Sequence, residues 1–110
     1  MPKILIIGAY GFYGSKVTSA LCDKGYEVGR GSRNPRGRTD AVAIDLQAPE
    51  TYPVFGNFDI IVNCSDSVKV TPDQAVKHVL TNGGTWLEMG ADGPSVERLL
   101  ESVLGPTPTG

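Results

Sequence analysis

The sequence has 110 residues, with 12 acidic and 10 basic side chains, 14 glycines and 8 prolines. This length suits one domain and leaves little room for a second. No apolar run approaches the roughly 18–20 residues that span a membrane, and no basic leader with a cleavage site opens the chain. Two cysteines, Cys22 and Cys64, are too few for a disulfide scaffold. We therefore expect buried free thiols, no membrane association and a reducing cytoplasm.

Charge is distributed unevenly along the chain. Residues 1–38 carry a net charge of +5, and residues 39–110 carry −7. The basic half ends in four arginines, at positions 30, 33, 36 and 38. A local basic patch of this kind is typical either of a site for a small anion or of a solvated loop. The overall charge of −2 argues against a nucleic-acid partner.

Strand and helix patterns alternate from the first residues onward. Short apolar runs predict strands at 3–7, 26–28, 41–45, 59–63 and 85–89. Apolar residues at helical spacing, with start and stop signals, predict helices at 14–24, 71–81 and 94–104. Residues 33–40 are too few for a crossover helix with its turns, so we expect a loop there. The pattern predicts one α/β domain over 1–104, and 105–110 as a tail or truncation point.

The segment between the first strand and the first helix has the spacing G-x-x-G-x-x-G. The spacing alone is weak evidence, but its position is that of a dinucleotide-binding fingerprint. We expect Gly8 to turn the chain, Gly11 to admit phosphate oxygens to backbone amides, and Gly14 to let the helix pack closely. A purely structural turn is the alternative. The predicted cofactor-binding loop is Gly8, Ala9, Tyr10, Gly11, Phe12, Tyr13 and Gly14, although Phe12 and Tyr13 also suit packing of the first helical turn.

The second predicted strand ends without a carboxylate. An NAD site places an acid there to bind the ribose 2′-hydroxyl, whereas arginine suits the 2′-phosphate of NADP. We therefore favour NADP over NAD. Arg33 is the expected phosphate ligand, Ser32 and Asn34 are supporting donors, and Arg36 or Arg38 are helpers.

Two further strand ends complete the candidate site. Asp45 and Leu46 lie where the third strand ends and are expected to flank the adenine, with Asp45 as a plain strand-end cap in the alternative interpretation. Asn63 and Cys64 lie where the fourth strand ends, at the carboxyl edge where such sheets bind their ligands. We expect both beneath the nicotinamide half, with a turn-forming role as the alternative for Asn63.

Four segments are similar to one known family. They are KILIIGAYGFYGSKV at 3–17, GSRNP at 31–35, FDIIVNC at 58–64 and GGTWLEMG at 83–90. Together they resemble the NAD(P)-binding domain of saccharopine dehydrogenase-like oxidoreductases, although extended short-chain reductases share the glycine loop. The resemblance implies a Rossmann-like, doubly wound parallel sheet of about five strands in the order 3-2-1-4-5. It also implies a nicotinamide dinucleotide cofactor and a separate catalytic domain in the parent protein.

No catalytic residue is predicted within the chain. None of the four tyrosines begins a Tyr-x-x-x-Lys pair, and the one histidine, His78, is expected at an exposed helix position. The histidine and cysteine content does not support a metal site. The open alternatives are an NADP(H)-binding domain without its catalytic domain, a stand-alone NADP-binding regulator or sensor, and a fragment of an extended short-chain dehydrogenase/reductase. An open sheet edge also indicates a homodimer.

Overall fold

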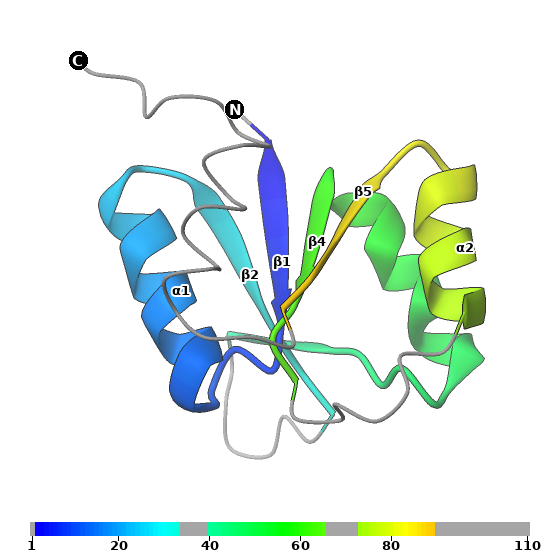
Figure 1. Cartoon of the computed structure of the whole chain (residues 1–110), viewed down its shortest axis with the longest axis horizontal. Coiled ribbons are helices and arrows are strands. Elements are labelled where there is room, and N and C mark those ends of the chain that lie inside the picture. Colours follow the sequence, from blue (N-terminus) through cyan, green and yellow to red (C-terminus); the bar gives the residue numbers. More distant parts are fainter. Residues whose placement is uncertain (1, 34–39, 66–72, 90–110) are drawn as a thin grey trace.

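The computed structural model describes residues 2–33, 40–65 and 73–89. Its five strands form one parallel sheet in the order β3-β2-β1-β4-β5 (Figure 1). The predicted strand order is therefore confirmed, and the fold is Rossmann-like.

The predicted helix at 94–104, the helix start at Thr71 and the candidate residues Asn34, Arg36 and Arg38 lie outside the described residues. In chain order the elements are β1 (Lys3–Ile7), α1 (Phe12–Asp23), β2 (Glu27–Ser32), β3 (Ala41–Ala43), the 3-10 helix η1 (Pro49–Asn57), β4 (Ile60–Asn63), α2 (Asp73–Thr81) and β5 (Thr85–Glu88).

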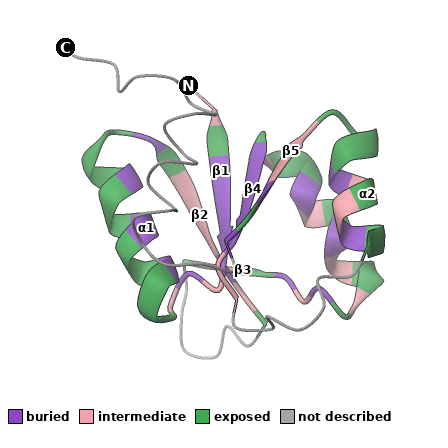
Figure 2. Cartoon of the chain, viewed as in Figure 1, coloured by how far each residue is buried: buried purple, intermediate pink, exposed green. Residues whose placement is uncertain are grey.

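The central strand β1 is buried on both faces, as its continuous apolar run predicts (Figure 2). Its alternate side chains belong to two separate cores. Ile4 and Ile6 pack with residues of α1, such as Leu21. Leu5 and Ile7 pack on the opposite face with residues of η1 and α2, such as Phe55. The sheet therefore has helices on both faces, and a ligand can reach it at the carboxyl ends of the strands.

Helix α1 ends one residue before the predicted position, in a glycine C-cap. Gly25 has φ +88°, and its N–H donates to the Cys22 carbonyl, while the Tyr26 N–H donates to the Leu21 carbonyl. This Schellman geometry returns the chain into β2, parallel to β1. The prediction that Cys22 is buried is wrong. Cys22 is exposed because the neighbouring Leu21 takes the core-facing position of the last helical turn.

The connection from β3 to β4 forms η1, which the sequence patterns do not predict. Its rings Tyr52 and Phe55 are buried and meet α2, where His78 lies 5.7 Å and 5.9 Å from their centroids. The expectation of an exposed His78 is therefore wrong, since η1 covers that part of α2 and leaves the side chain half-buried. Leu80, an apolar residue of the same helix, is 57% exposed.

Candidate functional site

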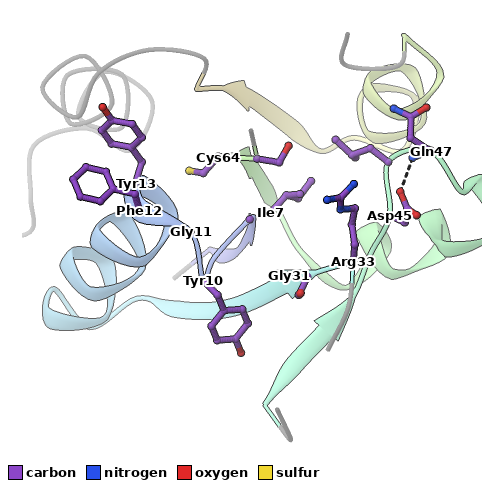
Figure 3. A pocket seen from close by; sticks show the side chains of 14 residues that line it. Ile7, Tyr10, Gly11, Phe12, Tyr13, Gly31, Arg33, Asp45, Gln47 and Cys64 are labelled. Atoms are coloured by element: carbon purple, nitrogen blue, oxygen red, sulfur yellow. Dashed lines mark hydrogen bonds between the residues drawn. The ribbon is translucent and has the colours of Figure 1, made fainter. Parts of the chain in front are cut away.

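A cavity of about 630 Å³ lies where the carboxyl ends of β1, β2 and β4 meet the residues after β3 (Figure 3). Parallel pairing brings these ends together, with Ile7 opposite Gly31 on one side and Asn63 on the other. The lining residues are Ile7, Gly8, Tyr10, Gly11, Phe12, Tyr13, Gly31, Ser32, Arg33, Asp45, Leu46, Gln47, Cys64 and Ser65. This is the edge at which open α/β sheets bind their ligands.

The three glycines of the fingerprint lie where the chain turns from β1 into the first turn of α1. Gly8 has φ +77°, and a Cβ built there would lie 2.9 Å from the backbone of Ser65. A Cβ on Gly14 would lie only 2.0 Å from the Gly8 carbonyl oxygen. Gly11 faces the cavity, and its added Cβ would meet only that same carbonyl oxygen, at 3.3 Å. The first and third glycines therefore allow the backbone to pack, and the middle one keeps the start of α1 open.

The first turn of α1 is electrically suited to an anion. Gly11 is the N-cap, no side chain caps the helix, and its first turn contains no acidic residue. The leading N–H groups of a helix have no intrahelical partners, and the helix dipole adds partial positive charge there. Phe12 and Tyr13 line the cavity at this point and are 69% and 41% exposed. Their rings contact each other edge to face at 5.0 Å, which fits packing with each other more than packing into the core.

Arg33 supplies positive charge at the end of β2. Its side chain is exposed and lies on the Asp45 side of the cavity in Figure 3. Within the described residues Arg33 forms no ion pair, whereas Arg30 lies 3.9 Å from the Asp40 carboxylate. The segment from Gly29 to Arg33, at the end of β2, contains no carboxylate.

The residues after β3 form the opposite wall. Asp45 Oδ1 accepts a hydrogen bond from the Gln47 N–H at 2.9 Å, so this carboxylate does shape the turn that follows the strand. Leu46 is buried, and its carbonyl accepts a bond from the Tyr52 hydroxyl of η1. The unpredicted helix η1 therefore supports the wall against which an adenine is expected.

Asn63 is buried and does not line the cavity. Its Oδ1 accepts bonds from the N–H and the hydroxyl of Ser65, and its Nδ2 donates to Glu88 on β5. The other Glu88 oxygen accepts a bond from Trp86 Nε1 at 2.7 Å. These contacts agree with the turn-forming interpretation of Asn63. Ser65, which these bonds hold in place, lines the cavity together with Cys64.

Cys64 lines the cavity as a half-buried free thiol. Burial, and to a lesser extent the Glu88 carboxylate, raise the pKa of this thiol to about 12. The thiol is therefore protonated throughout the physiological range, and a protonated thiol is a poor nucleophile.

The raised pKa predicts a difference in labelling between the two cysteines. At pH 8 a limiting amount of iodoacetamide should modify exposed Cys22 at least about tenfold faster than Cys64, because the thiolate is the reacting form. Peptide mass spectrometry of the labelled chain measures both rates. The Cys64 rate should still be rising at pH 10. Equal rates at pH 8 would contradict the description of Cys64 as a shielded, protonated thiol.

Most of the predicted cofactor residues gather in one place. Three described exceptions do not line the cavity: Ala9 and Asn63 are buried, and Gly14 lies beneath the turn. Four lining residues were not predicted, namely Ile7, Gly31, Gln47 and Ser65. Each is the direct neighbour in sequence of a predicted residue, so extending each predicted segment by one residue would have included them.

Comparison with known proteins supports the fold assignment. No protein-family model matches the sequence, and no curated protein matches it. Among solved structures, the fold is similar to a short-chain dehydrogenase/reductase superfamily protein from Agrobacterium tumefaciens with bound NAD, with a TM-score of 0.63, 16% identity and 78% of this chain covered. It is also similar to Helicobacter pylori ADP-L-glycero-D-manno-heptose-6-epimerase, with a TM-score of 0.55, 18% identity and 79% of this chain covered. A third similar structure is Thermus thermophilus UDP-glucose 4-epimerase in complex with NAD, with a TM-score of 0.50, 24% identity and 74% of this chain covered.

The chain spans only part of these proteins: the matched regions cover 31%, 38% and 30% of their lengths. At these identities the likeness establishes a shared Rossmann-like fold. Within the described ranges, no helix is long and apolar enough to cross a membrane. The same residues contain no cluster of three or more potential metal ligands among His, Cys, Asp and Glu.

Proposed function

We propose that the chain is the NADP(H)-binding domain of an oxidoreductase and holds the dinucleotide across the cavity. The observation that carries this proposal is the combination of an uncapped helix N-terminus at Gly11 with the exposed guanidinium of Arg33 on the same cavity. The first suits the pyrophosphate, and the second suits a 2′-phosphate. The similar structures with bound NAD support a dinucleotide in general.

The proposed cofactor extends from β3 to β4. Its adenine lies against Leu46 with Asp45 beside it, and its pyrophosphate lies on the amides at the start of α1. The nicotinamide half reaches Cys64 and Ser65, which line the cavity after β4. NADP brings hydride-transfer chemistry, and the residues of this chain bind and orient it. We place the substrate and the proton-transfer groups in a catalytic domain of the parent protein.

Two parent families suit this domain. The segments at 31–35 and 83–90 favour a saccharopine dehydrogenase-like oxidoreductase. The fold likeness to short-chain dehydrogenase/reductase proteins fits a fragment of that superfamily about equally well. Both alternatives have the same cofactor position, so one binding experiment tests the function proposed here.

The test is a fluorescence titration of the purified chain with NADPH and with NADH at matched ionic strength. We expect saturable binding of both, with NADPH at least about tenfold tighter, because one charge-assisted contact contributes about 1.5–3 kcal/mol. Inorganic phosphate at the same ionic strength is the control for a non-specific anion effect. Absence of saturable binding of either dinucleotide would refute the proposed function.

A further inference from the structure

Glu88, the last residue of β5, places a carboxylate at the β4 end of the cavity. Parallel pairing of β4 and β5 sets Glu88 opposite Asn63 (Figure 1). One Glu88 oxygen accepts a hydrogen bond from Asn63 Nδ2 at 2.9 Å, and the other accepts one from Trp86 Nε1 at 2.7 Å. A carboxylate has a separate oxygen for each of these two donors, whereas a glutamine amide has only one oxygen. The two bonds therefore hold a negative charge at the end of β4.

This charge acts on a group that lines the cavity. Cys64 directly follows Asn63, and it lines the cavity. Burial is the main cause of the raised pKa of its thiol, and the Glu88 carboxylate adds to it because a negative charge disfavours a thiolate nearby. A potential that disfavours an anion at this position stabilises a cation there. The charged residues of the described cavity lining, Arg33 and Asp45, follow β2 and β3 instead.

We infer that Glu88 makes the chain bind the oxidised dinucleotide in preference to the reduced one. The oxidised nicotinamide ring carries a positive charge, whereas the reduced ring is neutral. A carboxylate held beside the nicotinamide half therefore stabilises the NADP⁺ complex and has little effect on the NADPH complex. By thermodynamic linkage, this preference makes bound NADPH a stronger hydride donor than free NADPH. The inference rests on the proposed function, which places the nicotinamide half at Cys64 and Ser65.

The test measures the dissociation constants of NADP⁺ and NADPH by calorimetry, for the unmodified chain and for Glu88→Gln. Both redox forms carry the same phosphates, so the contributions of Arg33 and of the start of α1 cancel in their ratio. We expect the preference for NADP⁺ to fall about 2- to 5-fold in Glu88→Gln, the range for one solvent-exposed charge pair. Binding of 2′,5′-ADP, which has no nicotinamide, should change by less than about 1.5-fold because its subsite is distant from Glu88.

Glu27→Gln is the matched control, because it removes one negative charge at the start of β2, where Glu27 lies 3.8 Å from Lys3 Nζ. Glu88→Asp separates the charge from the hydrogen bonds, since it keeps the carboxylate and shortens the side chain by one methylene. It should keep the ratio within about 1.5-fold of the unmodified chain, because the charge moves only slightly. The thermal midpoint of each variant is measured in parallel.

Three results would overturn the inference. The first is equal weakening of NADP⁺ and NADPH in Glu88→Gln, or no change in either, since a charge effect must alter their ratio. The second is a ratio in Glu88→Asp as low as that in Glu88→Gln, which would assign the effect to the hydrogen bonds. The third is an equal change in Glu27→Gln. Failure of the unmodified chain to bind any dinucleotide would instead refute the proposed function, and this inference with it.

Discussion

Replacing Gly14 by alanine should lower the free energy of unfolding by about 3 kcal/mol or more, the upper part of the range for overpacked sites. The added Cβ would lie 2.0 Å from the Gly8 carbonyl oxygen, 2.8 Å from its carbonyl carbon and 3.1 Å from Ala9 Cα. All three are backbone atoms, so no side chain can rotate away. Helix α1 must then move off the turn or the turn must open.

Thermal and urea unfolding measure this effect. A loss of about 3 kcal/mol corresponds to a fall in Tm of more than about 10 °C for a chain of this size. Gly56→Ala is the matched control, because its added Cβ meets no atom within 4 Å. That substitution should stay within about 0.5 kcal/mol of the unmodified chain. If the two variants were equally stable, the close contact between α1 and the glycine turn would be wrong.

Replacing Arg33 by alanine should weaken NADPH binding about 10- to 150-fold, which corresponds to about 1.5–3 kcal/mol for one charge-assisted contact. NADH binding should change by less than about twofold. Arg33 is exposed on the cavity and forms no ion pair within the described residues, so its charge is available to a phosphate.

The control for this variant is Lys3→Ala, which also removes one positive charge but at the amino end of the central strand, away from the cavity. Lys3 begins β1, and its Nζ lies 3.8 Å from Glu27 rather than near the cavity. Both variants are titrated with NADPH and NADH at matched ionic strength, because long-range attraction falls with salt. Equal loss of both cofactors in Arg33→Ala, or equal effects of the two variants, would contradict a 2′-phosphate contact.

The alternation of strands and helices could be predicted from the sequence. The apolar run of β1 and the glycine after α1 depend on residues close together in the chain, and local patterns record such structure well. The position of the site followed from the same patterns, because parallel strands bring their carboxyl ends to one edge.

The features that could not be predicted depend on distant partners. Helix η1 contains two prolines and a glycine, which are typical of a loop, and its buried rings Tyr52 and Phe55 pack against α2, which follows later in the chain. Asn63 ends the expected strand, yet its side chain is hydrogen-bonded to Ser65 and to Glu88, which is 25 residues away in sequence. The bond from Tyr10 to Asp40 likewise joins segments that no local pattern relates.

The central claim is that a dinucleotide occupies the cavity from the end of β3 to the end of β4. Amide chemical-shift mapping of the ¹⁵N-labelled chain with saturating NADPH tests it most directly. We expect the largest shifts at Gly11, Ser32, Leu46 and Cys64, while Gly83, which does not line the cavity, stays near its starting position. The half-ligand 2′,5′-ADP should shift Ser32 and Leu46 and leave Cys64 unchanged. Shifts confined to residues that do not line the cavity, or no shifts at saturating NADPH, would contradict the claim.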